Sequence, residues 1–248
     1  MRYVTGAILL SLICSGCAPV QRPQPAQPVA RAFTYTPPEE PRRQLPATIA
    51  LVRPTYAEAT RARLTNGPVW ARSTTEAFAG SLRSDLEKIL IAKGFKVTGP
   101  YDKLDLMTFP EKTGANLTLT PVVELTLDAR VARRTAPTTL LYGTEEGVLL
   151  VGGWISLVML EPMTGEKMWI KRVEVEAAQE PYSMTSILVV RDGQRIQSIR
   201  SDSRPDALTS ALNRIYPKVM QTTWAYFHPD EVMITKQQAE ELRARKRY

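Results

Sequence analysis

The feature that most constrains the fold is the alternation of apolar and polar residues along segment 117–128. One set of alternate positions is wholly apolar and comprises Leu117, Leu119, Pro121, Val123, Leu125 and Leu127. The other set is polar except for Val122. A period of two predicts a strand of an antiparallel sheet, with one face buried and the other in water. Pro121 further predicts an edge position or a bulge, because proline has no N–H to donate to a neighbouring strand.

Three later segments predict further strands. Segment 148–160 is mostly apolar and contains a Gly-Gly pair at 152–153, where we expect a bulge or bend. A turn at 161–166 leads into a returning strand at 167–176. The Asp-Gly pair at 192–193 is typical of a hairpin turn, which predicts a small hairpin around it.

The residues before this region predict a strand–helix–strand unit. Segment 48–52 is a short apolar run, typical of a buried strand, and a loop is expected from there to Arg72. Residues 73–76 read Ser-Thr-Thr-Glu, the pattern of a capping box at the start of a helix. One helical face then carries Phe78, Leu82, Leu86, Ile89 and Leu90. Gly94 ends the helix, and 95–97 is expected to form a strand parallel to the first, with a right-handed crossover.

The C-terminal part of the chain predicts two helices. From Pro205 the apolar residues recur at helical spacing, with a kink expected at Pro217, and a last helix follows His228. Trp224, Tyr226 and Phe227 are expected to pack in the core. We therefore predict an α+β fold in two layers, with a mixed, mostly antiparallel sheet of about five strands packed against helices.

The N-terminus is typical of an exported protein. A basic residue precedes a short apolar run, 4–13, and small residues precede Cys17, which is the layout of a signal peptide. The run is shorter than the roughly 20 residues of a helix that crosses a bilayer. Residues 15–17, Ser-Gly-Cys, resemble the lipobox of bacterial lipoproteins. That resemblance implies removal of residues 1–16 and acylation of Cys17, including palmitate, and Ala18 after it implies the outer membrane.

A proline-rich segment separates this signal from the rest of the chain. Residues 18–46 hold eight of the 19 prolines, and glutamine and arginine fill many of the gaps. Proline fixes the φ angle and lacks the amide proton, so this stretch predicts an extended tether rather than helix or sheet. We therefore expect the lipidated cysteine and its tether over 17–46, and a single folded domain over 47–248.

The composition limits the chemistry. The chain has one histidine, His228, and two cysteines, Cys14 and Cys17, among its 248 residues. These are too few ligands for a zinc site of cysteine and histidine, and a catalytic triad would need His228. With no Gly-rich phosphate loop either, we expect no enzyme, no metal and no cofactor. The net charge of +7 suits an acidic ligand or anionic lipid, whereas export argues against nucleic acid as a partner.

Several segments resemble the neuraminyllactose-binding haemagglutinin (HpaA-like) family of bacterial surface lipoproteins. They are residues 49–54, 86–90 with 94–97, 146–149 through 160–166, 211–215 with 219–221, and 238–242. The most specific piece is Leu-Glu-Pro-Met-Thr-Gly-Glu at 160–166, and order and spacing match over 47–248. The resemblance implies an outer-membrane protein of adhesin type that binds sialylated glycans, associated with the cell surface and the flagellar sheath.

The resemblance also implies a ligand site. The family's segment for sialic acid recognition, Lys-Arg-Thr-Ile-Gln-Lys, corresponds to residues 132–137, where Arg134 and Thr135 match it. Arg130 and Arg133 lie nearby, and we expect all of these residues in a loop between two strands. A guanidinium can hold the carboxylate of sialic acid through two parallel hydrogen bonds.

Two functions remain open at this point. The first is a lipid-anchored adhesin, in which Tyr142 or Trp154 would pack on a sugar ring. The second is a structural envelope or flagellar-sheath lipoprotein that acts through contacts with envelope proteins. In that case the arginine-rich segment is a solvated turn or touches anionic lipid. The two differ in whether the domain faces the cell surface or the periplasm.

Overall fold

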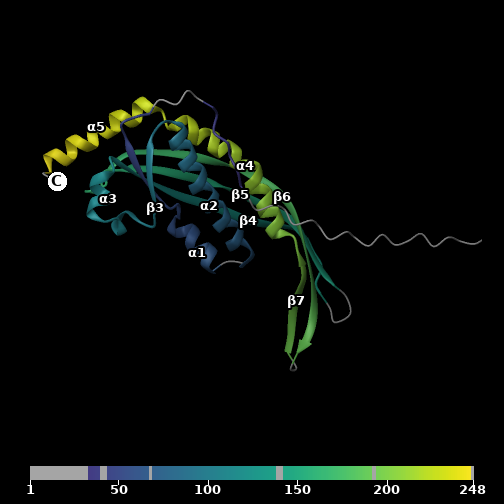
Figure 1. Ribbon diagram of the computed structural model, residues 1–248. Coiled ribbons are helices and arrows are strands. Elements are labelled where there is room, and N and C mark those ends of the chain that lie inside the picture. Colours follow the sequence, from purple (N-terminus) through teal and green to yellow (C-terminus); the bar gives the residue numbers. More distant parts are fainter. Residues whose placement is uncertain (1–32, 40–43, 67–68, 138–141, 192–193, 247–248) are drawn as a thin grey trace, which may run out of the picture.

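One mixed sheet organises the computed structural model of the chain (Figure 1). The structure describes residues 33–39, 44–66, 69–137, 142–191 and 194–246, so the expected signal peptide and Cys17 lie outside it. The sheet has seven strands in the order β3-β1-β4-β5-β6-β7, with β2 beside β4. The strands are β1 (Thr48–Val52), β2 (Thr55–Tyr56), β3 (Lys96–Tyr101), β4 (Leu117–Arg134), β5 (Gly143–Leu160), β6 (Lys167–Arg191) and β7 (Gln194–Asp202). The α+β class is as predicted, but the sheet has more strands than the five expected and curls around the helices.

β4 is a central strand of this sheet. It runs parallel to β1, with pairs up to Leu119, and parallel to β2, with pairs from Val122. On its other side it pairs antiparallel with β5. The prediction that Pro121 marks an edge or a bulge is therefore wrong. Pro121 is tolerated because it falls between the two short partners, where β4 has no paired residue in β1 or β2.

The remaining pairings follow the sequence prediction. β1 and β3 are parallel, and β5, β6 and β7 are antiparallel neighbours. The expected irregularity at the Gly-Gly pair is present as a register shift between Val151 and Gly153. Gly153 has a φ of 136°, and a Cβ there would lie 2.0 Å from the carbonyl oxygen of Glu124. Only glycine fits this position, because of both its backbone conformation and the approach of β4.

The first helical region begins earlier along the chain than the sequence predicted. The helices are α1 (Glu58–Asn66), α2 (Val69–Ala92), α3 (Phe109–Gly114), α4 (Arg204–Tyr226) and α5 (Pro229–Arg245), with a short 3-10 helix at Leu104–Leu106. The expected loop up to Arg72 therefore holds β2, α1 and the start of α2. The capping box expected at 73–76 is wrong, because these residues lie inside α2. Thr75 instead donates its hydroxyl proton to the carbonyl of Ala71, 3.0 Å away and one turn back, as hydroxyls inside helices do.

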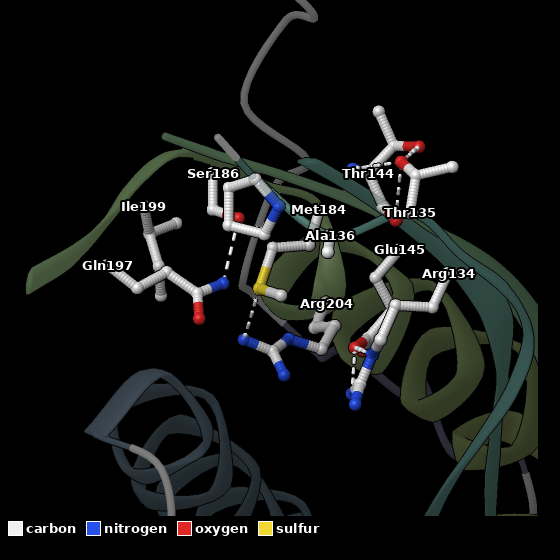
Figure 2. Close-up of a pocket in the computed structure, with 11 residues that line it drawn as sticks. Arg134, Thr135, Ala136, Thr144, Glu145, Met184, Ser186, Gln197, Ile199 and Arg204 are labelled. Carbon is white, nitrogen blue, oxygen red and sulfur yellow. Dashed lines mark hydrogen bonds and ion pairs between the residues drawn. The ribbon is translucent and has the colours of Figure 1, made fainter. Parts of the chain in front are cut away.

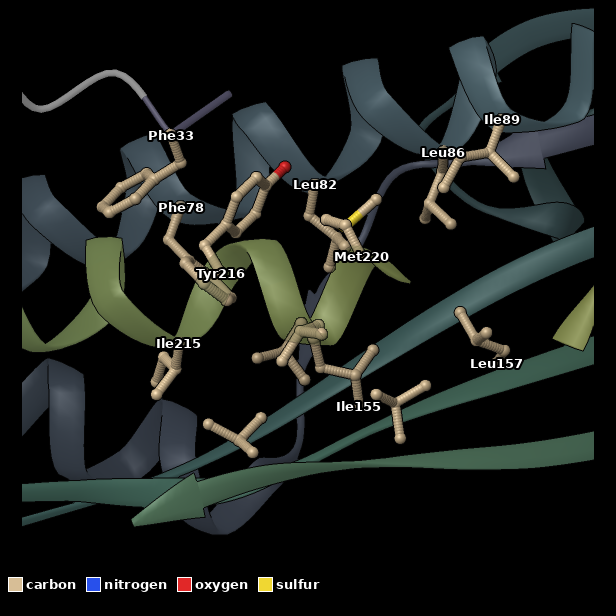
Figure 3. Packing of buried hydrophobic residues seen from close by; sticks show 14 of the residues in the cluster. Phe33, Phe78, Leu82, Leu86, Ile89, Ile155, Leu157, Ile215, Tyr216 and Met220 are labelled. Carbon is tan, nitrogen blue, oxygen red and sulfur yellow. The ribbon is translucent and has the colours of Figure 1, made fainter. Parts of the chain in front are cut away.

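The hydrophobic core lies between the concave face of the sheet and the helices α2 and α4 (Figure 3). All five residues of the predicted apolar stripe on α2 are fully buried. They meet Tyr216 and Met220 of α4, and beneath them lie Ile155 and Leu157 of β5. Phe227 is buried and Trp224 nearly so, as the core interpretation of this aromatic group predicts.

The C-terminal half of the expected tether also contributes to this core. Phe33 is only 3% exposed, and its ring centroid lies 5.5 Å from that of Phe78 and 5.7 Å from that of Tyr216. The packed part of the chain therefore extends to Phe33, before the boundary predicted at residue 47. Aromatic burial of this kind offsets the ordering of a proline-containing segment, whose φ angles are already restricted.

Two long hairpins extend past the helices at one end of the sheet (Figure 1). β4 and β5 form the first, and β6 and β7 form the second. β6 runs well beyond the predicted strand 167–176. The predicted hairpin is present, with pairs from Met184 and Asp202 to Arg191 and Gln194, and its expected turn at 192–193 lies outside the described residues.

Candidate functional site

A hollow of about 500 Å³ lies where the two hairpins leave the body of the domain (Figure 2). Its lining is mainly polar and includes two arginines. The lining residues are Arg134, Thr135, Ala136, Pro137, Thr144, Glu145, Met184, Ser186, Gln197, Ile199 and Arg204. This volume falls within the range of about 300–1,000 Å³ that is usual for ligand pockets.

Arg134 reaches this hollow from the last residue of β4. The expectation that Arg130, Arg133 and Arg134 lie in a loop is wrong, because β4 continues through all of them and pairs with β5. The sequence pattern missed this because the outer half of β4 is exposed on both faces, and so shows no alternation. Arg134 is paired directly opposite Glu145 of β5.

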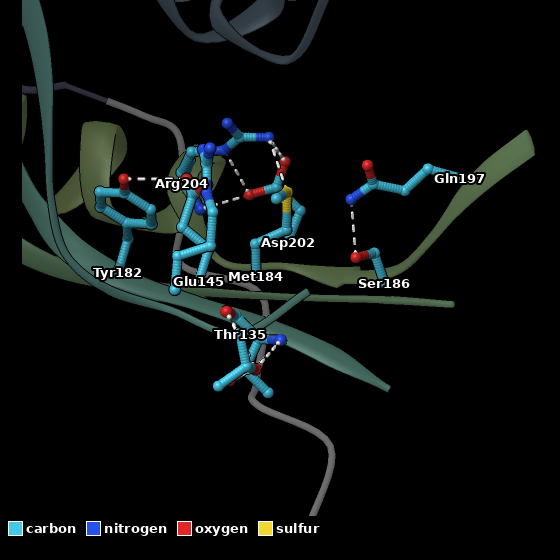
Figure 4. A network of polar contacts seen from close by, with 10 residues as sticks. Thr135, Glu145, Tyr182, Met184, Ser186, Gln197, Asp202 and Arg204 are labelled. Atoms are coloured by element: carbon cyan, nitrogen blue, oxygen red, sulfur yellow. Dashed lines mark hydrogen bonds and ion pairs between the residues drawn. The ribbon is translucent and has the colours of Figure 1, made fainter. Parts of the chain in front are cut away.

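Glu145 is a buried carboxylate that lines the hollow, and Figure 4 shows the polar contacts around it. Its Oε2 accepts hydrogen bonds from Nε of Arg134, at 2.8 Å, and from Nη2 of the same guanidinium. Its Oε1 accepts a hydrogen bond from the hydroxyl of Tyr182, at 3.1 Å. Burial raises the pKa of Tyr182, and the neighbouring carboxylate raises it further, so the phenol keeps its proton.

A second arginine, Arg204, enters the hollow from the first residue of α4. Asp202 holds it through two hydrogen bonds, from Nε at 2.8 Å and from Nη2 at 2.7 Å. Nη2 also approaches the sulfur of Met184, at 3.3 Å. The hydrogen bond from Arg204 to Asp202 raises the pKa of the guanidinium, which therefore stays charged. Sequence reasoning missed Arg204 and Glu145 because nothing local connects them with Arg134.

The other predicted residues have separate positions. Thr135 lines the hollow, and its hydroxyl lies 2.8 Å from that of Thr144 across the hairpin. Arg130 pairs with Asp128 on its own strand, at 3.0 Å, and lies outside the hollow. Arg133 has no ion pair with any residue that the structure describes. Thr135 and Arg134 are therefore the two predicted residues that come together.

The two aromatic residues considered for sugar stacking do not join this site. Tyr142 is exposed but is not part of the lining. Trp154 lies nine residues from Glu145 along β5, which is about 30 Å in an extended strand. The Arg172 guanidinium is stacked over the Trp154 ring, 4.7 Å from its centroid.

The orientation of Arg134 leaves part of its guanidinium free to bind. A guanidinium carries five N–H groups along two edges. Glu145 takes the edge formed by Nε and Nη2. The edge formed by Nη1 and Nη2 has no partner among the residues that the structure describes beyond Glu145, and the side chain of Arg134 is 67% exposed. Glu145 therefore holds the group in place while its outer edge can still bind an anion through two parallel hydrogen bonds.

The described residues offer neither a buried histidine nor a cluster of metal ligands. His228 lies before α5 and is largely exposed, 3.9 Å from Asp230. Within the described ranges no group of three or more histidine, cysteine, aspartate or glutamate side chains is placed to hold a metal ion. None of the helices in the part of the chain that the structure covers is long and apolar enough to cross a membrane.

Comparison with known proteins connects this architecture with one group of relatives. The chain is 27% identical to the neuraminyllactose-binding haemagglutinin of Helicobacter pylori strain 26695, over 89% of this chain and 85% of that protein. A second relative, from strain J99, is 27% identical over 87% of this chain and 83% of its own length. The crystal structure of a neuraminyllactose-binding haemagglutinin homologue from Helicobacter pylori has the same fold. It has a TM-score of 0.55 at 15% identity, over 84% of this chain and 99% of that one. No family model matches the chain.

The chain is similar to the neuraminyllactose-binding haemagglutinins over most of its length. The segment that most specifically resembles this haemagglutinin family, 160–166, lies at the end of β5 away from the hollow. Its Glu161 is fully buried, and Oε1 accepts two hydrogen bonds from Arg243 of α5, at 2.9 and 2.7 Å. Oε2 accepts the backbone N–H of Thr164, at 2.6 Å. Arg243 also donates to the carbonyl of Ala115, at 3.2 Å, so the pair joins the β5–β6 turn to two helical segments. The contacts of segment 160–166 therefore give it a structural role in this domain.

Proposed function

We propose that this protein is a lipid-anchored envelope protein that binds acidic glycans in the hollow between the two hairpins. The observation that carries the proposal is the outer edge of Arg134, held in place by Glu145 and open to the hollow. Sialic acid offers a carboxylate that fits this edge. The hollow adds hydroxyl and amide groups that can hydrogen-bond to sugar hydroxyls, from Thr135, Ser186 and Gln197. The names of the relatives point to the same class of ligand.

The proposed role is binding without catalysis. The polar groups of the hollow are occupied in pairs, Arg134 with Glu145 and Arg204 with Asp202. The hydroxyls of Thr135 and Thr144 lie next to each other. Among the described residues no histidine, lysine or carboxylate is in hydrogen-bonding contact to activate them. This arrangement suits recognition of a ligand, and it needs no metal or cofactor.

Binding of sialyllactose to the purified full chain tests the glycan site. Arg134→Lys keeps the charge and loses the planar fork, so the proposal expects it to weaken binding clearly. A charge-assisted hydrogen bond contributes about 1.5–3 kcal/mol, which corresponds to at least a tenfold loss of affinity. Arg172→Lys, on the same sheet but remote from the hollow, is the matched control and should leave binding unchanged. Failure of the wild type to bind at millimolar sialyllactose would remove the glycan function.

The proposed anchor is the acylated Cys17, which would hold the domain at the outer membrane. Cys17→Ser should leave an unprocessed precursor and abolish palmitate labelling, since the thiol is the proposed acceptor. Several acyl chains hold a protein on a membrane firmly, whereas one holds it only marginally. Normal processing and membrane retention in this variant would contradict the anchor.

A second candidate is a structural envelope or flagellar-sheath protein that acts through protein contacts. The observation that favours it is the exposure of large apolar side chains on the second hairpin, where Val189, Ile196 and Ile199 are 37%, 45% and 55% exposed. The side of the membrane separates the two candidates. Protease added to intact cells should cut the exposed tether of an adhesin, whereas a periplasmic domain would be protected.

A further inference from the structure

The edge of β4 that faces away from β5 has hydrogen-bond partners along the first half of the strand, whereas the second half has none among the described residues. At Val123 and Leu125 the outward edge has hydrogen-bond partners within the domain. The carbonyl of Val123 accepts the N–H of Ala57, at 2.9 Å. The N–H of Leu125 donates to the hydroxyl oxygen of Thr60, at 3.1 Å, and that hydroxyl donates back to the carbonyl of Leu125, at 3.3 Å. Thr60 therefore ends the row of partners that β1 and β2 began.

Beyond Leu125 the same edge is open. In an extended strand the backbone groups of alternate residues point to the same side. The carbonyls of Glu124 and Arg130 lie against β5, so those of Leu127, Ala129 and Val131 point away from it. None of these three residues has an outward hydrogen-bond partner within the described part of the chain. Ala129 and Val131 are also exposed. Such an edge is a template for another strand.

The side chains along this edge are complementary to themselves. Asp128 and Arg130 are 60% and 71% exposed and share one face of the strand. If a second copy of the edge pairs antiparallel with the first, centred on Ala129, Asp128 of each copy lies opposite Arg130 of the other. On the other face, Leu127 of each copy lies opposite Val131 of the other. Opposite charges and apolar groups directly across two strands both stabilise pairing.

The length of the open edge is limited at both ends. Thr60 occupies the position beside Leu125. At the other end the register with β5 shifts between Val131 and Arg133, and such an irregularity bends a strand. Residues 127–131 therefore form one short, bounded segment, and a symmetric pairing of two copies uses all of it. Charged side chains on an edge strand usually discourage association. Here Asp128 of each copy would face Arg130 of the other, so the charges favour pairing of two identical edges.

We propose that the protein forms a twofold-symmetric dimer through antiparallel pairing of residues 127–131 of β4. The pairing joins the sheets of two copies into one continuous sheet, as expected for an isologous interface. Each copy contributes the backbone N–H and C=O groups of Leu127, Ala129 and Val131. The hollow around Arg134 stays outside the paired segment, so the dimer would carry two such hollows.

Charge reversals on the purified full chain test the dimer. Asp128→Arg places arginine opposite arginine, and Arg130→Asp places aspartate opposite aspartate. Each should weaken the dimer by about tenfold or more in sedimentation or light-scattering measurements, because like charges replace opposite ones at two symmetric positions. An equimolar mixture of the two variants should dimerise again, since every cross-strand pair is then of opposite sign. Glu174→Arg, an equal change of charge on β6, is the control and should not alter the mass.

A second variant tests the backbone. Ala129→Pro removes an N–H that points away from β5, so the monomer should fold while the dimer is lost. A wild type that stays monomeric at about 0.1 mM would overturn the proposal, because such an interface would be too weak to matter. A dimer that survives both charge reversals and Ala129→Pro would place the interface elsewhere and overturn it equally.

Discussion

The two ends of the sheet each contain a buried carboxylate held by an arginine, and the two pairs differ in what else they do. Glu161 and Arg243 lie where helices cover the sheet, with side chains 0% and 19% exposed. Glu145 and Arg134 lie where the hairpins leave the body, with side chains 6% and 67% exposed. The first pair has its hydrogen bonds satisfied by the fold. The second leaves one edge of a guanidinium unused.

This difference separates what holds the domain together from what is free to bind. The segment around Glu161 has the most specific resemblance to the family, and its role is structural. The segment around Arg134 shares only two positions with the family's recognition motif. Buried ion pairs tolerate little change, because removing one partner leaves an uncompensated charge. An exposed guanidinium is less constrained by the fold, so its surroundings can differ while the fold stays the same.

The largest expected effect is on the Glu161 end. Arg243→Met removes the cation and leaves Glu161 as a buried charge without its main partner, which should lower the free energy of unfolding by about 3–5 kcal/mol. Urea denaturation of the full chain measures it. Lys236→Met on the same helix removes a partly exposed i, i+4 pair with Glu240 and is the control, with an expected loss of about 0.5 kcal/mol. Equal losses in the two variants would mean that the Glu161 pair is not a structural centre.

A core substitution gives the reference against which both ends are compared. Leu125 is buried beneath the helices, and Leu125→Ala should cost about 2–5 kcal/mol of stability. Its neighbour Thr126 faces the opposite side and is exposed, so Thr126→Ala should cost much less. Thermal or urea unfolding of both variants measures the contrast. Similar costs at the two positions would contradict the assignment of the buried face of β4.

The contrast between the body and the hairpins also explains how much the sequence could predict. In the body, β4 shows a period of two and α2 an apolar stripe, because each has one buried face. Past the helices no residue needs to be apolar, so the sequence predicts a loop for the outer half of β4. The order of the strands in the sheet could not be predicted from the sequence either, because the pairing of β1 with both β3 and β4 depends on residues far apart in the chain.

The candidate site shows the same limit. Arg134 and Thr135 could be found from their match to a short motif. Glu145, Tyr182 and Arg204 come from two other strands and a helix, and only the fold brings them together. The sequence places Phe33 in the tether because it lies within the proline-rich segment 18–46. Its burial depends on ring contacts with Phe78 and Tyr216, which no local pattern reveals.

A smaller effect should appear in the pH dependence of stability. Burial raises the pKa of Glu161, but hydrogen bonds from Thr164 and Arg243 outweigh it and leave the pKa below its usual value. A lowered pKa means that the unfolded chain binds the proton more readily. The contribution of Glu161 is therefore present above the unfolded pKa, near 4.5, and is lost as pH falls through the folded one. Wild type and Glu161→Gln should converge in stability as pH falls from 7 to 3, whereas a constant difference would contradict this.

The smallest effect on stability is expected at the hairpin end. Arg134 is largely exposed, so its ion pair is screened by water, and Glu145 keeps the hydrogen bond from Tyr182 when the arginine is removed. Arg134→Met should therefore lower the free energy of unfolding by about 1–3 kcal/mol, less than Arg243→Met does, because only one oxygen of the buried Glu145 loses its partner. The same variant should lose sialyllactose binding, because both charge and fork are gone. A stability loss as large as that of Arg243→Met would show that Arg134 is a structural residue like Arg243. The comparison between the two ends would then fail, and with it the reason for placing the ligand at Arg134.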